Sequence, residues 1–439
     1  MNGAPNQTQL PTLGPTSCRK IWLMLSFQCA TNPRPLTQRH KIGLAVAGGG
    51  PIGGIYELGA LRALEELIDG ATLTRLDAYV GVSSGAIMAA SLANRIDTAE
   101  MCRILLSAEN AEYPFHPGIF LKPAFGEFAQ RLAQVPRVLR AVAISMIKNP
   151  FSTKLADSLG KFGALLPTGL FDNDEVERFL RKLFTTGGRS NDFRELDRPL
   201  SVVAVEIDTG QTVLFGGPGY DDVPISKAIQ ASSALPGLYP PVEIKRRHFV
   251  DGALKRTLNA SVVLEAGVDL VIGLNPLVPY DANRALASGK AKLPSLVRSG
   301  LPAVLSQMFR SLLQSRMHVG LAKYDQKYEH SDLLLVEPDA DDAKMFFTNE
   351  FSFASRQHLA EHAYLKTLQD FRAHRVKVNE MLARHGLKLN EKVLGDTQRT
   401  IWTGLKQKPV RRTRSTARLN RALEDLEAQL LAAKKPVKS

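Results

Sequence analysis

A serine flanked by glycines is the residue with the clearest chemical potential in this chain. The stretch GVSSG at 81–85 follows a short apolar run and precedes the apolar segment 86–93. The pattern G-x-S-x-G between a strand and a helix is typical of a nucleophile elbow, a sharp turn that presents a serine hydroxyl at the start of a helix. The sequence therefore predicts Ser83 as a nucleophile, with Gly81 and Gly85 supporting the turn.

A glycine-rich stretch lies upstream, between the apolar segment 42–47 and a helical pattern over 56–69. It contains Gly48, Gly49, Gly50, Gly53 and Gly54. Without Cβ atoms, such a turn can aim several backbone N–H groups at one point in front of a helix, where an anion would bind. The spacing also matches the dinucleotide fingerprint G-x-G-x-x-G, so a nucleotide-binding oxidoreductase is one alternative and a simple packing turn is another.

The next strand separates these alternatives. Dinucleotide binding requires an acidic residue at the far end of that strand, about 20 residues past the loop. Here Asp77 stands before the strand, and the nucleophile-elbow pattern follows it. The combination favours an oxyanion-binding loop beside a nucleophile.

A serine nucleophile needs a base to take its proton. The chain has nine histidines, but none follows a predicted strand in a way that stands out, and packing or surface roles are expected for them. Asp251 is the better candidate, because it ends the short strand 247–250 and is followed by Gly252. An Asp-Gly pair alone is usually only a turn.

Together these segments resemble the patatin-like phospholipase family, acyl hydrolases with a Ser-Asp dyad. The landmarks occur in the family's order between about residues 40 and 255. They are the glycine loop, the elbow, the block 231–241 and Asp251-Gly252-Ala253, with a further similarity at 169–172. The resemblance implies that Ser83 is the nucleophile and Asp251 the base. It also implies an oxyanion hole made by the N–H groups of Gly48, Gly49 and Gly50, and motif support from Gly53, Gly81, Gly85 and Gly252.

The implied activity is hydrolysis of fatty acyl esters of lipids or phospholipids through an acyl-enzyme, of the phospholipase A or lysophospholipase type. The resemblance implies no cofactor and no metal. Two residues depart from the family pattern: Ile52 stands where Lys or Arg is usual, and Ala253 where Gly is commonest. A lipid- or partner-binding module on a catalytically weakened scaffold is therefore the alternative function.

The elements that must position these residues form an α/β pattern. We expect strands near 42–47, 78–82, 200–207, 247–250, 270–274 and 332–336, separated by helical stretches. The expected fold is a central, mostly parallel sheet with helices on both faces, patatin-like, in a domain over 41–390 with its motif core at 41–260. Helical insertions are expected at about 100–170 and 280–325. Within them, 125–147 and 296–321 are amphipathic and could pack on the core or contact lipid.

Both ends of the chain are expected to lie outside the domain. Residues 1–40 are predicted to be a disordered leader, since the apolar run 21–27 is too short to span a bilayer and marginal for a secretion signal. Residues 391–439 are predicted to be a basic tail with a short amphipathic helix, whose leucines at 419–430 could form a brief coiled coil.

Composition favours a lipid-facing enzyme in a reducing compartment. The three cysteines, Cys18, Cys29 and Cys102, form no metal or disulfide pattern, so a cytoplasmic location is expected. The net charge is +13, with much of the excess in the tail at 406–421, where no aromatic residues are interleaved. Anionic membrane is therefore a more economical partner than nucleic acid. The sequence does not indicate an oligomeric state.

Overall fold

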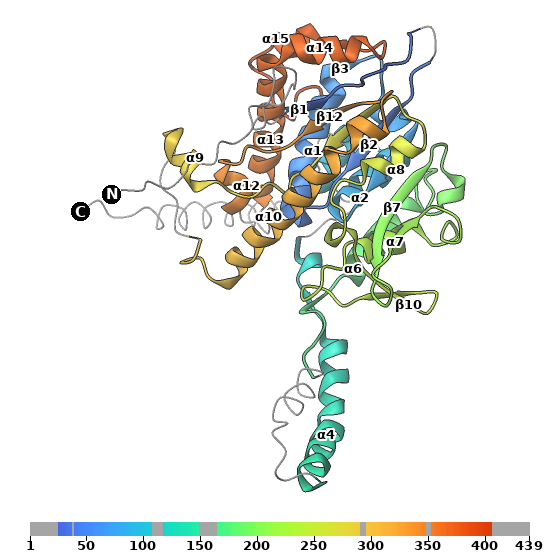
Figure 1. The fold of residues 1–439 in the computed structure, drawn as a ribbon, viewed down its shortest axis with the longest axis vertical. Helices are drawn as coiled ribbons and strands as arrows, with labels where there is room; N and C mark the ends of the chain where they lie inside the picture. The colour runs from blue at the N-terminus through green and yellow to red at the C-terminus, as the bar shows by residue number, and fades with distance from the viewer. Residues whose placement is uncertain are drawn as a thin grey trace, which may run out of the picture. The chain divides into compact units, whose positions relative to one another are not determined.

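The computed structural model describes residues 25–36, 39–107, 117–148, 165–289, 296–347 and 353–405. A nine-stranded sheet runs through its centre, in the order β1-β12-β11-β2-β4-β7-β10-β9, with β8 paired to β7 (Figure 1). The strands are β1 (Leu25–Gln28), β2 (Ile42–Val46), β4 (Ala78–Gly81), β7 (Leu200–Glu206), β8 (Thr212–Phe215), β9 (Val242–Ile244), β10 (Arg247–Asp251), β11 (Leu270–Leu274) and β12 (Asp332–Val336). The six predicted strands are all present, each within one residue of its expected bounds.

The middle of the sheet is parallel and its edges are antiparallel. β12, β11, β2, β4 and β7 pair in parallel, whereas β1, β8, β9 and β10 join by antiparallel pairing. Every residue of β2, β4, β11 and β12 is buried, as expected for parallel strands covered on both faces. The carboxyl ends of β2 and β4 lead into the glycine loop and the elbow, so topology alone places these two motifs next to each other.

Helices cover both faces of the sheet. On one face, α8 (Ala260–Glu265) and α10 (Leu301–Leu321) share a core cluster with the side chains of alternate strand residues, such as Ala45, Val80 and Leu335. On the other, α2 (Ser84–Ala93) packs on β2, β4 and β7, and α1 (Gly50–Leu67) packs against α2 and α13 (Phe353–Ala373). This arrangement confirms the expected mostly parallel α/β fold.

The remaining elements complete the layers and the small sheets. The other helices are α3 (Thr98–Leu106), α4 (Phe125–Lys148), α6 (Asp174–Phe184), α7 (Ile225–Ser232), α9 (Ala282–Ala287), α11 (Tyr324–Lys327), α12 (Ala343–Phe347), α14 (Arg375–Ala383) and α15 (Glu391–Gly395). Short 3-10 turns occur at Leu73–Arg75, Pro117–Phe120, Phe193–Glu195 and Gly252–Leu254. Two-residue strands pair as β3 (Ile68–Asp69) with β13 (Lys388–Leu389), and as β5 (Lys122–Pro123) with β6 (Phe171–Asp172).

The first helix begins earlier than the apolar periodicity predicts. α1 starts at Gly50, inside the glycine stretch, with Pro51 in its first turn, where the fixed φ of proline suits a helix start. Gly53 lies within this helix. The position is a glycine because Pro276 packs against it: an added Cβ would approach the Pro276 ring to 2.9 Å. This glycine therefore serves close packing in addition to the loop.

The two ends of the domain also differ from expectation. Leu25–Gln28 lies inside the segment for which a disordered leader is predicted, yet these residues form β1, paired with β12 at the sheet edge. At the other end, α15 and Ile401, which is fully buried, belong to the same compact unit as the sheet, and the second unit begins at Trp402. The basic cluster at 406–421 and the leucine repeat at 419–430 lie outside the described residues.

None of the helices in the described ranges is both long enough and apolar enough to cross a bilayer. α4 confirms the predicted helix over 125–147, and α10 confirms the one predicted over 296–321 from Leu301 onward, since 296–300 are not helical. α10 contributes Leu313 and Met317 to the core cluster, so one of its faces is a core-packing face.

Candidate active site

Ser83 lies in a sharp turn between β4 and α2. It is the residue that precedes the first turn of α2, and its backbone has φ 53° and ψ −123°, a conformation that residues with a side chain rarely adopt. The flanking positions must be glycine, because neither has room for a Cβ atom. A Cβ on Gly85 would lie 2.3 Å from the Ala47 carbonyl oxygen, and one on Gly81 would lie 2.5 Å from Ala86 Cα. The local geometry is therefore that of the predicted nucleophile elbow.

Asp251 ends β10 and lies against the elbow. β10 pairs with β7, which in turn pairs with β4, so the carboxyl end of β10 is brought to the region of Ser83 across 168 residues of sequence. The Asp251 carboxylate accepts a hydrogen bond from the Ala253 N–H at 2.8 Å, and the Ser83 side chain lies near enough to lower the pKa of this carboxyl. Both residues are nearly inaccessible to water, at 5% exposure for Ser83 and 4% for Asp251.

The electrostatics of Asp251 suit a proton acceptor. Burial raises the pKa of this carboxyl to about 6, while the hydrogen bonds from Ala253 and Ser83 lower it. Both donors are uncharged, so no cation holds the carboxylate permanently in its ionised form. A carboxyl with a pKa near neutrality can both accept and return a proton at physiological pH.

The glycine loop lies beside Ser83. A Cβ on Gly48 would come within 2.9 Å of the Ser83 Cβ and 3.5 Å of the Ala253 Cβ, so Gly48 lies against Ser83 and against the residue two positions after Asp251. Gly50 has φ 62° and space around it. The Gly49 N–H donates to the Ser84 hydroxyl at 3.0 Å, so in this structure it is engaged by a neighbour of Ser83.

One residue that fixes the elbow has no role in the sequence analysis. The Ser232 hydroxyl accepts from the Ser83 N–H at 2.8 Å and donates to the Val203 carbonyl at 2.6 Å, and so ties the elbow to β7. The Asp251 N–H donates to the Ala234 carbonyl two residues further on. The block 231–241 is therefore a clamp on both candidate catalytic residues, and its match to a family landmark was the only signal for it.

A buried acidic group lies behind the loop. Glu57 in α1 is fully inaccessible, and burial raises the pKa of its carboxyl well above the ordinary range, partly offset by the Ser84 side chain. The Ser84 side chain thus interacts with Glu57, and its hydroxyl also accepts a hydrogen bond from the Gly49 N–H. The helical spacing of the apolar residues in α1 did not indicate that the Glu57 carboxyl is buried, because Glu57 is a single acidic residue in an otherwise apolar pattern.

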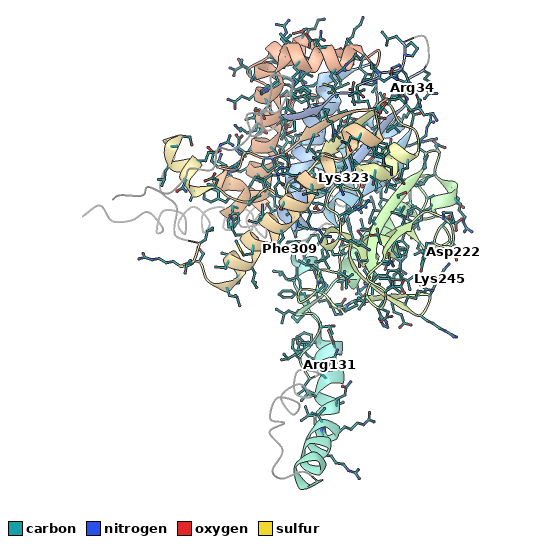
Figure 2. The ribbon with its side chains drawn as sticks, viewed as in Figure 1. Arg34, Arg131, Asp222, Lys245, Phe309 and Lys323 are labelled. Carbon is teal, nitrogen blue, oxygen red and sulfur yellow. The ribbon has the colours of Figure 1, made fainter. Side chains whose placement is uncertain are left out.

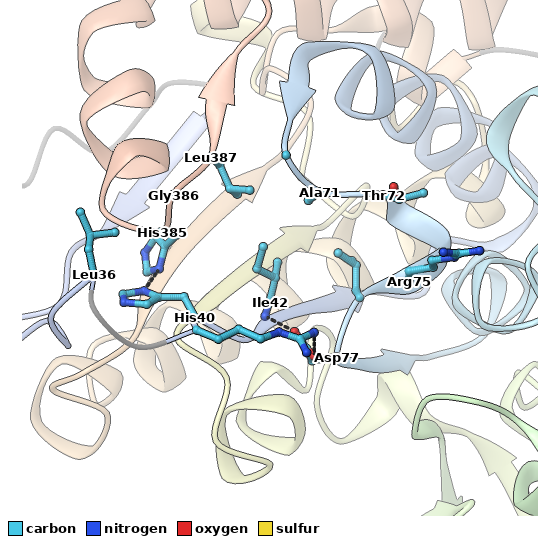
Figure 3. A pocket seen from close by; sticks show the side chains of 13 residues that line it. Leu36, His40, Ile42, Ala71, Thr72, Arg75, Asp77, His385, Gly386 and Leu387 are labelled. Carbon is cyan, nitrogen blue, oxygen red and sulfur yellow. Dashed lines mark hydrogen bonds and ion pairs between the residues drawn. The ribbon is translucent and has the colours of Figure 1, made fainter.

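The histidines lie elsewhere. In the described part of the chain, no histidine hydrogen-bonds to Ser83 or Asp251. His385 instead bonds Asp332 at 2.7 Å and His40 at 2.9 Å, near the amino ends of the strands. These imidazoles line a cavity of about 440 Å³ at that end of the sheet, together with Arg75 and Asp77, as Figure 3 shows. This cavity is therefore not the site of the predicted chemistry.

The family match agrees with this geometry. Residues 44–264, about half of the chain, match the family described as patatin-like phospholipase. This protein belongs to the patatin-like phospholipase family. The matched range includes the glycine loop, the elbow, the Ser232 clamp and Asp251, and it identifies the protein as a member of a family of lipid acyl hydrolases.

Solved structures offer distant similarities to this family member. VipD from Legionella pneumophila is 14% identical, with a TM-score of 0.29, and the match covers 96% of this chain and 93% of VipD. The type III effector ExoU is 17% identical, with a TM-score of 0.27, over 90% of this chain and 70% of ExoU. Full-length ExoU of Pseudomonas aeruginosa in complex with SpcU is 16% identical, with a TM-score of 0.23, over 78% of this chain and 62% of that one.

Proposed function

We propose that this protein hydrolyses fatty acyl esters of phospholipids or lysophospholipids with Ser83 as nucleophile and Asp251 as general base. The observation that carries the proposal is the contact between the two residues. The Ser83 side chain, at a strained elbow, interacts with a carboxyl whose pKa is raised by burial. A serine hydroxyl is activated when an adjacent base accepts its proton during attack.

The first half of the reaction forms an acyl-enzyme. The Ser83 proton passes to Asp251 as the Ser83 oxygen bonds to the ester carbonyl carbon, and the carbonyl oxygen becomes an oxyanion. The alcohol then leaves, taking the proton from Asp251, and the acyl group remains on Ser83. In the second half, water gives its proton to Asp251 and attacks the acyl carbon, and the fatty acid departs as Ser83 regains a proton.

The oxyanion is assigned to the loop 48–50. Gly48 lies close to Ser83, and no atom lies within 4 Å of a Cβ built on Gly50, which supports a place for the oxyanion beside this loop. The Gly49 N–H can donate to the oxyanion only if it releases the Ser84 hydroxyl, to which it donates in this structure. One good donor of this kind contributes about 3 kcal/mol to transition-state stabilisation.

The residue at position 52 bears on the alcohol part of the substrate, which carries the headgroup in a phospholipid. Ile52 is half-buried in the first turns of α1, where the family usually has a cation, so this position offers no charge to a phosphate headgroup. We therefore expect uncharged acyl esters to be accepted as well as phospholipids and lysophospholipids.

A fluorophosphonate probe tests the proposal directly, because it labels only a serine that has been activated as a nucleophile. We expect stoichiometric labelling of the wild type, with the modified peptide containing Ser83, and no labelling of Ser83→Ala. Asp251→Asn should react at least about a hundredfold more slowly. A wild-type protein that is folded but unreactive would instead support a binding module on a weakened scaffold.

A further inference from the structure

α10 has two apolar faces, and only one of them is covered. Leu313 and Met317, exposed by 3% and 8%, point into the core cluster that also holds Val82 and Ala253, the neighbours of Ser83 and Asp251. The buried Arg310 lies on the same side and donates to the Val278 carbonyl. This face explains why the helix packs on the domain.

The opposite face is a straight apolar stripe in contact with solvent. Its members are Leu301, Leu305, Met308, Leu312 and Val319, exposed by 69%, 58%, 53%, 64% and 60%. Steps of four, three, four and seven residues keep these side chains within about 60° of one another around a helix, and the stripe is about 27 Å long. Single exposed apolar residues are ordinary, whereas five in line are a feature of binding surfaces.

The charge around the stripe has one sign. Between Asp281 and Asp325 the sequence contains no acidic residue, and it contains seven cationic ones. They are Arg284, Lys290, Lys292, Arg298, Arg310, Arg316 and Lys323. Figure 2 labels Phe309 on α10 and Lys323 just beyond its end. Arg284 pairs with Asp339 and Arg310 is buried on the core side, so the exposed cations of the described residues here are Arg298, Arg316 and Lys323. A partner that matches them and the stripe is both apolar and negatively charged.

We propose that the exposed stripe of α10 docks this protein onto an anionic phospholipid bilayer. Apolar side chains of such a helix insert at the boundary between headgroups and acyl chains, while flanking cations remain level with the phosphates. The stripe contains no aromatic residue on which a nucleic acid base could stack. The choice of a bilayer rests on the proposed function, since a lipid substrate brings the enzyme to such a surface.

The docked helix would hold the reacting groups close to the membrane. The Arg316 guanidinium donates to the Leu254 carbonyl at 3.1 Å, and Leu254 lies three residues after Asp251. α10 is therefore bonded to the turn that carries the candidate base, as well as packed on the core beneath it.

Binding of the full-length protein to vesicles tests the proposal. The probes are vesicles of phosphatidylcholine alone and of phosphatidylcholine with about a third phosphatidylglycerol, assayed by co-sedimentation. We expect the wild type and Ser83→Ala to bind the anionic vesicles equally, and the double variant Leu305→Glu, Leu312→Glu to bind at least about tenfold more weakly. Val376→Glu is the matched control, because Val376 is 73% exposed on α14 and should leave binding unchanged.

Hydrolysis of a soluble p-nitrophenyl ester separates this proposal from the proposed function. The double variant should keep the wild-type rate on that ester, which also shows that it is folded. If no protein hydrolyses the ester but binding follows the expected order, the docking surface stands and the proposed function fails. Undiminished binding by the double variant, or equal binding of the wild type to both kinds of vesicle, would overturn the proposal.

A second measurement does not depend on a destabilising variant. Met308→Cys, in a chain with Cys18 and Cys29 replaced by serine, can carry an environment-sensitive fluorophore. We expect a blue shift on addition of anionic vesicles and quenching by lipid-borne quenchers. No shift would overturn the proposal, as would a dimer of the wild type that dissociates in the double variant, since the stripe would then be a protein interface.

Discussion

The two ends of the central sheet differ in the groups that surround a buried carboxylate. At the amino end, Asp332 is fully buried and lies beside a cation, the Arg384 guanidinium at 3.4 Å, and beside the His385 imidazole at 2.7 Å. At the carboxyl end, Asp251 receives only the uncharged donors Ala253 N–H and Ser83 hydroxyl. A carboxylate paired with cations is a structural ion, whereas one that is solvated by neutral donors keeps its basicity.

The two ends of the sheet also differ in shape, and the difference shows that the volume of a cavity is a poor guide to the candidate active site. The amino end has an open, charged cavity with Arg39 and Asp77 paired at its rim. At the carboxyl end, Ser83 and Asp251 are almost inaccessible. Backbone strain at Ser83 and the interaction of its side chain with the buried Asp251 carboxyl identify the candidate site better than a recess does.

The largest expected effect tests which end performs the chemistry. Ser83→Ala and Asp251→Asn should each lower kcat/KM on a p-nitrophenyl ester by about 10³-fold or more, because one removes the nucleophile and the other the base. His40→Asn and His385→Asn should each cost less than about tenfold. A histidine variant as inactive as Ser83→Ala would reverse the assignment and indicate a triad.

The next effect tests the structural role of the amino end. Asp332→Ala leaves Arg384 and His385 facing an empty buried site, so we expect the free energy of unfolding to fall by about 3 kcal/mol while the folded variant keeps its kcat. Urea denaturation measures this change. Asp222→Ala is the control: Asp222 pairs with Lys245 on the surface, labelled in Figure 2, and its loss should leave the free energy of unfolding almost unchanged, because exposed ion pairs contribute little to stability. Equal costs for the two variants would contradict the comparison.

A smaller effect tests the clamp on the elbow. Ser232→Ala removes the acceptor of the Ser83 N–H, and we expect kcat to fall by about 10- to 100-fold with little change in KM, since the hydroxyl of Ser83 is then less well aimed. Ser233→Ala is matched in sequence and chemistry, because the buried Ser233 hydroxyl has no hydrogen-bond partner in the described residues. Its activity should stay within about twofold of the wild type.

The smallest effect sharpens the contrast between the carboxylates. Because the pKa of Asp251 is raised to about 6, its basic form is lost as the pH falls below 6, and kcat/KM on a soluble ester should decline to about a tenth by pH 5. A profile that is flat from pH 7 to pH 5 would exclude Asp251 as the base.

The same raised pKa has a consequence for folding. The native state binds the Asp251 proton more tightly than the unfolded chain does, so this group's contribution to stability is complete below about pH 4. It is lost as the pH rises through 6, and the loss is at most about 3 kcal/mol. In Asp251→Asn this pH dependence of the free energy of unfolding should disappear.

Local signals in the sequence were enough for the five parallel strands of the sheet, for β10 and for the two motifs at the carboxyl ends of β2 and β4, but β1, β8 and β9 were not predicted. Continuous apolar runs predicted β2, β4 and β11, and glycines at 81 and 85 predicted the elbow, because both features follow from steric requirements within a few residues. β1 was missed because its four residues become a strand only by pairing with β12, more than 300 residues away.

Other features depend on contacts that no local pattern encodes. The roles of Ser232 and of His385 are defined by partners across the fold, at Ser83 and at Asp332. For α10, periodicity showed an amphipathic helix but could not show that apolar residues occupy two opposite faces, one in the core and one in solvent. Whether an apolar side chain is covered is decided by tertiary structure.

The backbone at Ser83 sets protein stability against catalysis. Its φ of 53° with ψ of −123° is a conformation that glycine adopts freely and that costs a residue with a Cβ of order 1–3 kcal/mol. Glycine at this position would therefore give a more heat-tolerant protein with no nucleophile. Directed evolution that selects for thermal resistance alone would tend to replace the one side chain on which ester hydrolysis depends.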